Sequence, residues 1–348
     1  MESLSIQSRI KGSIFGVAVV DALGGPVEFQ PRGTFDPVSD FEHNDHFNVP
    51  PGTWTDDTSM TLCLAQALID CNGEFIPQAA VLNYINWFDN GYLSATDECF
   101  DIGAATTKAL IIWKRYLERS QDLRDDDTKN CKDWRFYIEF ALRREQFCGN
   151  GSLMRVSPIA LVYFRNMPEA LANAVTSSDV THPYPTCAEA CTLYTKVLVL
   201  ILHGASKASL ATSLAETPIR DPKIQARLSK YQSLADWQSQ DEGNIKSSGF
   251  VVSTLEAALW SFFSTESFRE GALRAVNLGW DADTVGAVYG GLAGAFYGIE
   301  EIPQKWVGGL QKGDVVGGVA EGLVKLAERG SEDSPGDTSI RNLQTSSD

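Results

Sequence analysis

Two short acidic motifs, far apart in the sequence, carry the clearest chemical signal. The first is TDDT at 55–58 and the second is DADT at 281–284. In each motif two carboxylates and threonine hydroxyls precede a stretch with helical character, so each motif is predicted to open a helix, the first beginning near Ser59. Helix capping explains either motif taken alone, because Asp and Thr are favoured N-caps and negative charge complements the helix dipole.

Two carboxylates within three residues are more than a helix cap requires. If the fold brought both pairs together without a cation, several like charges would lie at short range. Magnesium or manganese would remove that repulsion, because hard divalent cations prefer carboxylate and hydroxyl oxygens. We therefore hypothesise that the two motifs share a metal site.

A third acidic residue, Glu28, follows a turn in the segment DALGGPVEF at 21–29. The glycines and the proline of this segment are expected to end a helix and redirect the chain. Taken alone, Glu28 is interpreted as an ordinary surface carboxylate. If it faces the acidic motifs, it can act as a metal ligand or as the general base that activates water.

The elements that position these residues are predicted to be helices. Apolar residues recur at helical spacing in four segments, whereas alternating runs typical of strands are scarce. These segments contain Ile10, Ile14 and Val17; Met60, Leu64 and Leu68; Val81, Ile85 and Phe88; and Leu255, Leu259 and Phe262. A last helix carries glycines four residues apart, at Gly286, Gly290, Gly294 and Gly298. Such a stripe lowers helix propensity and predicts a face where another helix or backbone packs very closely. The fold class is therefore expected to be all-α.

Domain organisation is predicted to be simple. One domain is expected over residues 1–329, followed by a disordered tail at 330–348 whose composition cannot bury a core. Two polar stretches, at 120–133 and 232–248, are interpreted as surface loops.

Composition limits the partners and the compartment. The formal net charge of −16 opposes tight binding to a polyanion, so no stable nucleic-acid partner is expected. The seven scattered cysteines contain no C-x-x-C pair, which favours a reducing, cytosol-like compartment, with a nuclear or mitochondrial location left open. The apolar segment 14–23 is interrupted by Asp21 and is interpreted as a buried helix, so no membrane partner is expected.

The ordered series of motifs resembles the ADP-ribosylglycohydrolase family. The resemblance covers about residues 10 to 306. Six motifs in the same order identify the family far more specifically than any single motif does. The motifs are DALGGPVEF (21–29), GTWTDDTSM (52–60), GYLSATDECFDIG (91–103), GNGSLMRVSP (149–158), THP (181–183) and NLGWDADT (277–284).

The resemblance implies a compact all-α domain that holds two Mg²⁺ or Mn²⁺ ions near its centre. Transferred to this sequence, the metal ligands are Thr55, Asp56, Asp57, Asp281, Asp283 and Thr284. Glu28 would sit beside the scissile bond, and Asp57 is the second residue for which a direct chemical role is predicted.

The resemblance also implies that two loops lie against the ADP-ribose, where glycines allow backbone N–H groups to approach phosphate oxygens. The predicted substrate-binding residues are Phe100, Asp101, Gly103, Gly149, Asn150, Gly151, Ser152, His182 and Trp280. The family usually has glycine where this chain has Val20 and Trp280. Val20 is expected to affect only packing. Trp280 is expected either to stack on part of the substrate, to narrow the mouth of the cleft, or to fill space as a buried side chain.

The predicted function is metal-dependent hydrolysis of the C1″ glycosidic bond of ADP-ribosylated proteins or small molecules, with release of ADP-ribose. An arginine linkage is favoured by analogy with the family. Two alternatives stay open: a non-catalytic ADP-ribose-binding or structural protein on the same fold, and a hydrolase of another N- or O-glycoside. Two other groupings, His43 with His46 and His182 with Cys187 and Cys191, resemble metal sites less well.

Overall fold

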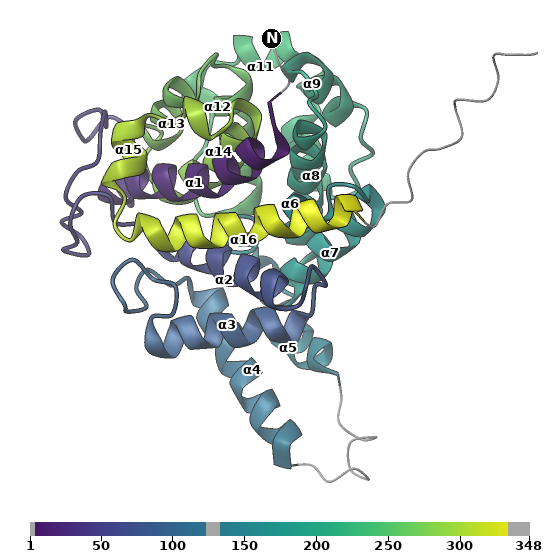
Figure 1. Cartoon of the computed structure of the whole chain (residues 1–348). Coiled ribbons are helices and arrows are strands. Elements are labelled where there is room, and N and C mark those ends of the chain that lie inside the picture. The colour runs from purple at the N-terminus through teal and green to yellow at the C-terminus, as the bar shows by residue number, and fades with distance from the viewer. Residues whose placement is uncertain (1–3, 123–132, 333–348) are drawn as a thin grey trace, which may run out of the picture.

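The computed structural model describes residues 4–122 and 133–332, and the regular structure of these residues is helical, as predicted (Figure 1). The α-helices are α1 (Ile6–Gly24), α2 (Asp56–Asp70), α3 (Pro77–Asn90), α4 (Ala104–Asp122), α5 (Trp134–Leu142), α6 (Ser157–Tyr163), α7 (Met167–Asp179), α8 (Pro185–Leu202), α9 (Lys207–Ala215), α10 (Pro222–Leu228), α11 (Leu234–Ser239), α12 (Val251–Phe263), α13 (Phe268–Val276), α14 (Ala282–Tyr297), α15 (Gln304–Gly309) and α16 (Gly313–Glu332).

The centre of the molecule is the pair α1 and α14, which pack along each other over most of their length. Glycines line the contact on both helices. A Cβ atom added at Gly290 would overlap the carbonyl oxygen of Gly16, and one added at Gly294 would overlap that of Gly12. The predicted glycine stripe is therefore confirmed as a face of close helix packing.

The same contact continues to the ends of the helices where the acidic motifs begin. A Cβ atom at Gly24, the last residue of α1, would overlap the backbone of Ala282 and Asp283 at the start of α14. The close crossing thus fixes the end of α1 against the opening of α14.

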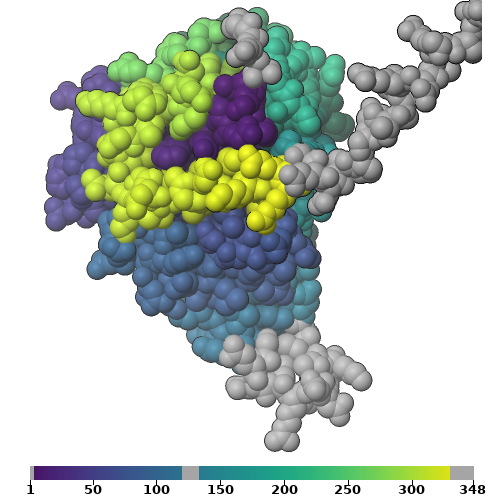
Figure 2. Space-filling view, in the orientation of Figure 1, coloured from purple at the N-terminus to yellow at the C-terminus, as the bar shows by residue number. Residues whose placement is uncertain are grey.

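The remaining helices surround this pair. Helix α12 packs on α14, α2 packs on α3, and α16 lies against both α1 and α2. Figure 2 shows α16, in yellow, stretched across the surface above the blue segments of α2 and α3. The buried apolar side chains form one contiguous core.

Several boundaries differ from the sequence prediction. Helix α2 begins at Asp56 rather than near Ser59, because Thr55 is its N-cap and both aspartates belong to its first turn. The stretch 232–248 is not simply a surface loop, since it contains α11, whose Trp237 is fully buried.

The two other predicted polar segments are only partly described. Helix α4 extends into the first of them as far as Asp122, and residues 123–132 lie outside the described part of the chain. Helix α16 crosses the predicted domain boundary after residue 329 and ends at Glu332. The predicted disorder of the remaining tail, 333–348, also falls outside the described residues.

Two segments are long and apolar enough, by length and composition alone, to cross a membrane: Ile6–Val27 and Pro185–Leu202. Their apolar windows are 83% and 67% buried inside the molecule. Both segments are placed as core helices of this fold, which agrees with the interpretation of 14–23 as a buried helix.

The glycine crossing leads to a stability prediction. Gly290→Ala introduces a methyl group against the Gly16 carbonyl in a contact that has no space for it, and we expect a loss of about 1–3 kcal/mol or more in the free energy of unfolding. Denaturant unfolding followed by circular dichroism measures the change.

The matched control is Gly318→Ala in α16, where an added Cβ meets no atom within 4 Å. At this exposed helical position alanine is expected to raise the free energy of unfolding by up to about 1 kcal/mol. Equal effects of the two substitutions would contradict the close crossing of α1 and α14.

Candidate active site

The two acidic motifs meet in space. The hydroxyl of Thr284, in the first turn of α14, lies 3.2 Å from Asp57 Oδ2 in the first turn of α2. Conversely, a threonine of the first motif contacts an aspartate of the second, since Thr55 Oγ1 lies 3.4 Å from Asp283 Oδ2. The N-termini of α2 and α14 therefore face each other, as the metal hypothesis requires.

Asp21 joins the motifs from α1, although it is absent from the site predicted from the sequence. Its side chain is fully buried and accepts hydrogen bonds from the backbone N–H groups of Thr55 and Thr58, each at 3.0 Å. The hydroxyls of the same two threonines also donate to it, at 2.9 and 2.5 Å. Asp21 thus caps α2 from another helix. The available signal was a single carboxylate interrupting an apolar helix, where a buried charge requires partners.

Glu28 is also buried, in contrast to its interpretation as a surface carboxylate when taken alone. Two groups of three acidic residues can each place one oxygen per residue within 4.8 Å of one another. The groups are Asp21 with Asp57 and Asp283, and Glu28 with Asp101 and Asp283. Asp101, predicted as a substrate contact, therefore belongs to the acidic cluster as well.

Burial and mutual repulsion set the electrostatics of this cluster. Loss of solvent, followed by the charge of neighbouring aspartates, raises the pKa of Asp56, Asp57 and Asp283 well above the usual range. Burial raises the pKa of Asp281 to about 6 and that of Asp21 to about 7, although hydrogen bonds from Thr58 and Thr55 oppose the second shift. Without a cation, the cluster therefore favours protonated carboxyl groups.

The donor set fits divalent cations. One oxygen of each of three buried carboxyl groups, Glu28 Oε2, Asp57 Oδ1 and Asp283 Oδ1, has no hydrogen-bond partner. Unpartnered buried carboxylate oxygens are costly in a protein without a counter-charge, and hard cations take such ligands together with threonine hydroxyls. Two predicted ligands, Asp57 and Asp283, thus offer free oxygens where a metal would need them, and Glu28 offers a third.

A cavity of about 440 Å³ opens over the cluster. The acidic motifs and their neighbours contribute Glu28, Asp56, Asp101, Asp281, Asp283 and Thr284 to its lining. The predicted substrate loops contribute Gly103, Gly149, Asn150, Gly151 and His182. The other lining residues were not predicted from the sequence, and they are Phe29, Ile102, Ala104, Ala105, Thr106, Gln146, Phe147, Met154 and Gly249. Acidic residues thus share one cavity with glycine-rich backbone that can approach an anionic ligand closely.

Five predicted residues do not line this cavity. Thr55 and Asp57 lie buried behind the residues that do. Ser152 is buried and accepts a hydrogen bond from Ser178 Oγ at 2.9 Å, so its hydroxyl supports the loop from inside. Phe100 packs its ring 5.3 Å from that of Phe47. The side-chain orientations of Ser152 and Phe100 are set by contacts with residues outside their own sequence motifs.

Trp280, the fifth of these residues, is not a buried space-filling side chain, because 51% of it is exposed. Its backbone has a φ of 59°, in the left-handed region that favours glycine. Two hydrogen bonds hold this conformation: Phe29 N–H donates to the Trp280 carbonyl at 2.6 Å, and Trp280 N–H donates to the Gln30 carbonyl at 2.7 Å. Trp280 therefore joins the Glu28 turn to the second acidic motif through its backbone.

The glycine loop is supported by a fully buried arginine, Arg155. Its guanidinium donates to the Gly151 carbonyl and to Thr181 Oγ1, the second at 2.7 Å. Thr181 in turn lies 2.8 Å from Nδ1 of His182, whose pKa is lowered to about 3 by burial and then by Arg155. Arg155 thus fixes two substrate loops at once, while burial, helped by the charge of Arg155, keeps His182 neutral by lowering its pKa.

Asn150 connects the glycine loop to the acidic motif of α14. Its side-chain amide donates to Asp281 Oδ2 and, at 2.9 Å, to Thr254 Oγ1. Its backbone N–H donates to the Gly249 carbonyl at 3.1 Å. The predicted substrate residue Asn150 therefore also orients a predicted metal ligand.

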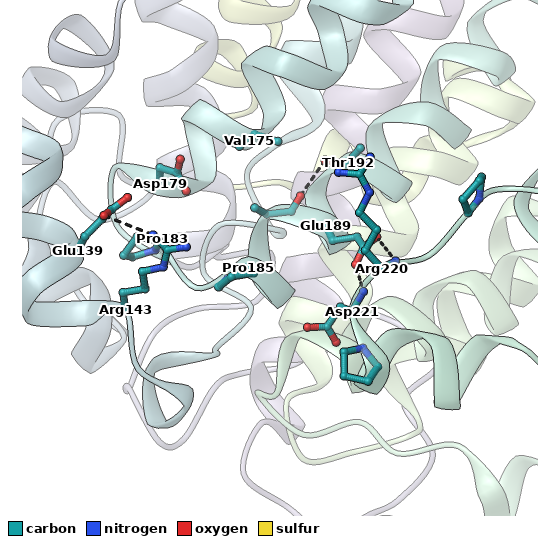
Figure 3. A pocket seen from close by; sticks show the side chains of 13 residues that line it. Glu139, Arg143, Val175, Asp179, Pro183, Pro185, Glu189, Thr192, Arg220 and Asp221 are labelled. Atoms are coloured by element: carbon teal, nitrogen blue, oxygen red, sulfur yellow. Dashed lines mark hydrogen bonds and ion pairs between the residues drawn. The ribbon is translucent and has the colours of Figure 1, made fainter.

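A larger cavity of about 710 Å³ lies elsewhere, between α7, α8 and the segment before α10 (Figure 3). Glu139 and Arg143 on its wall form an ion pair at 3.4 Å, and Glu189 accepts hydrogen bonds from the backbone of Arg220 and Asp221. Glu139 and Glu189 thus already serve structural contacts. The smaller cavity is therefore the candidate active site, because it alone of the two contains the acidic motifs.

The weaker metal groupings do not form sites in the described structure. His43 Nδ1 lies 2.7 Å from the Val49 carbonyl, and the His46 ring packs edge-on against that of Phe47. Cys191 Sγ contacts Ser152 Oγ at 3.5 Å, which agrees with burial of this cysteine without a metal.

Comparisons with known proteins agree with the geometry. The sequence model of the ADP-ribosylglycohydrolase family matches residues 2–333. The ADP-ribosylarginine hydrolase Tri1 of Pseudomonas putida (strain GB-1) is 35% identical over 300 residues, which cover 86% of this chain and 73% of that protein. The protein of the same name from Serratia proteamaculans (strain 568) is 31% identical over 92% of this chain and 80% of its own length.

A solved structure, described as an ADP-ribosylglycohydrolase-related protein complex, shares the fold with a TM-score of 0.73. It is 34% identical and the match covers 92% of this chain and 99% of that one. Because the family match spans nearly the whole sequence and the acidic motifs meet at one cavity, the chain belongs to the ADP-ribosylglycohydrolase family.

Proposed function

We propose that this protein hydrolyses the bond between C1″ of ADP-ribose and a guanidino nitrogen of arginine, using two Mg²⁺ or Mn²⁺ ions. The observation that carries the proposal is the meeting of two acidic helix N-termini, with unpartnered carboxylate oxygens, beside one cavity. The choice of arginine is supported by the names of two relatives above 30% identity, which are called ADP-ribosylarginine hydrolases. The partner is ADP-ribosylated protein or a small ADP-ribosylated molecule, and the formal net charge of −16 disfavours a nucleic acid.

The residues that would hold the cations are Thr55, Asp56, Asp57, Asp281, Asp283 and Thr284. When bound, the cations supply positive charge beside the ribose hydroxyls and the attacking water. Both Mg²⁺ and Mn²⁺ accept octahedral oxygen ligands, and for that reason both stay in the proposal. Because Asp57 lies behind the cavity lining, we assign it to cation binding rather than to contact with the scissile bond.

Glu28 is the residue we assign to proton transfer. It lines the cavity, and its Oε2 atom has no hydrogen-bond partner. Without cations, burial and then the neighbouring Asp283 charge raise the pKa of Glu28 and keep it protonated. Bound cations would lower that pKa, so that Glu28 is ionised and can accept and return a proton. In the proposed reaction Glu28 takes a proton from water while the oxygen of that water forms a bond to C1″. The C1″–N bond breaks, and the departing guanidine receives a proton in return.

The rest of the cavity is suited to hold ADP-ribose. Backbone N–H groups near Gly149 and Gly151 can approach the diphosphate closely, because neither residue has a side chain. His182 is neutral, and its Nδ1 is engaged with Thr181, which leaves Nε2 for the substrate. The ring of Phe147, which also lines the cavity, is available to pack against the adenine base.

The proposed metal site predicts the effect of replacing two of its ligands, which come from different helices. Asp56→Asn and Asp283→Asn each remove a negative charge from the cluster, and we expect each to lower kcat/KM for an ADP-ribosyl-arginine peptide by about 100-fold or more. Release of ADP-ribose is measured with and without added Mg²⁺ or Mn²⁺. The control is Asp314→Asn, an exposed acidic residue in the first turn of α16. Full turnover by both cluster variants would exclude the metal mechanism.

The raised carboxyl pKa values also predict how the stability of the metal-free protein depends on pH. The carboxyl groups of the cluster have higher pKa values in the folded than in the unfolded protein, so folding takes up protons. The stability that this uptake provides at low pH is lost as pH rises through about 6 for Asp281 and about 7 for Asp21. We therefore expect the chelator-treated protein to have a lower Tm at about pH 8 than at about pH 5, whereas added Mg²⁺ or Mn²⁺ raises Tm mainly at the higher pH.

Differential scanning calorimetry with chelator and with each cation measures this dependence. Asp56→Asn is expected to reduce both the pH dependence and the response to cations. A Tm that does not respond to either cation at the higher pH would argue against the proposed cluster.

A further inference from the structure

Two buried thiols lie in contact behind the substrate loop. Cys148 immediately precedes Gly149, and Cys187 is in the first turn of α8. Their Sγ atoms are 3.7 Å apart, and the Cys187 sulfur also lies 3.5 Å from the Gly149 carbonyl oxygen. Both cysteines are free and buried. In the sequence, Cys187 is four residues from Cys191 and is therefore grouped with it. The spacing within one helix cannot indicate that Cys148, from a distant segment, contacts Cys187.

We propose that Cys148 and Cys187 are a redox modification site, which a hydroperoxide converts to a disulfide that displaces the substrate loop at 149–152 and slows hydrolysis. The effect on hydrolysis rests on the proposed function. The formation of the disulfide does not.

The reaction balances with a hydroperoxide as the oxidant. The thiolate of one cysteine attacks the peroxide oxygen, giving a sulfenic acid and, from hydrogen peroxide, water. The second thiol then attacks that sulfur, the S–S bond forms, and a second water leaves. Cys148 is the better first nucleophile, because a hydrogen bond from the Cys187 thiol lowers its pKa while the same contact raises the pKa of Cys187.

Formation of the disulfide requires the sulfurs to approach from 3.7 Å to about 2.05 Å. Cys187 is fully buried on a long core helix, whereas Cys148 is attached to a loop that contains two glycines. The movement is therefore expected on the side of Cys148. This loop also carries Asn150, whose amide donates to Asp281, so a shift of the loop acts on a predicted metal ligand as well as on the substrate.

Two other buried cysteines have different surroundings. The sulfur of Cys191 contacts Ser152 Oγ, and that of Cys63 contacts the carbonyl oxygens of Asn83 and Tyr92. These contacts are with oxygen, so they provide internal comparisons for an oxidation experiment. Cys99 provides a third comparison, because it is partly exposed and has a raised pKa from burial and from Asp56.

The test starts with the reduced full-length protein, treated with hydrogen peroxide, alkylated and digested for peptide mass mapping. We expect a peptide pair joined through Cys148 and Cys187 that has lost both thiol hydrogens. In parallel, kcat/KM for an ADP-ribosyl-arginine peptide is expected to fall by about tenfold or more, since displacements near 1 Å at a site cost up to about 100-fold. Dithiothreitol is expected to restore the rate.

Substitutions identify the pair responsible. Cys148→Ser and Cys187→Ser are expected to keep the rate of the reduced protein and to resist peroxide, whereas Cys191→Ser and Cys99→Ser are expected to lose activity as the natural chain does. Absence of the joined peptide, or equal inhibition of the Cys187→Ser variant, would overturn the proposal. A joined peptide with unchanged kcat/KM would also overturn it.

A separate readout distinguishes this proposal from the proposed function. If the reduced protein hydrolyses no ADP-ribosyl-arginine peptide, the proposed function fails, but ADP-ribose binding by calorimetry still reports on the loop. Weaker binding after oxidation, reversed by dithiothreitol and absent in Cys187→Ser, supports the redox site. Equal binding in the oxidised and reduced forms contradicts it.

Discussion

The mutual repulsion of buried carboxylates at two helix N-termini is the constraint on which this structure depends. Asp56, Asp57 and Asp283 are withdrawn from water and face one another, and burial with neighbouring charge raises their pKa values. Helix dipoles and hydrogen bonds offset only part of this cost. Divalent cations would offset the rest. The buried carboxylates that destabilise the metal-free fold are therefore the groups that we expect to bind the cations.

The central helix pair determines that these carboxylates meet. Close contact between the glycines of α1 and α14 leads directly to Gly24, which abuts the backbone of Asp283. One turn earlier on α1, Asp21 accepts the backbone N–H groups that open α2. Three helices are thus joined at one point, and each contributes a carboxylate. Packing at the core and geometry at the site are consequences of the same helix crossing.

The substrate side of the cavity is positioned by buried polar contacts rather than by apolar packing alone. Arg155 holds the glycine loop and the segment before His182, while Asn150 connects that loop to Asp281. The Cys148–Cys187 contact lies behind the same loop. A change at Arg155 or Asn150 is therefore expected to reach a predicted substrate contact or metal ligand, because these two side chains hold the loop directly.

The sequence by itself determined the helical class, the glycine contact face and the two acidic motifs, because helical periodicity and residue chemistry are local properties. It also identified most of the residues that line the cavity. Only the tertiary structure decided that Asp21 caps α2, that Asp101 joins Glu28, and that Ser152 faces the interior. It likewise decided that Trp280 is exposed and held by its backbone. These properties depend on side-chain direction and on contacts between distant segments, and neither is encoded in the spacing of any one motif.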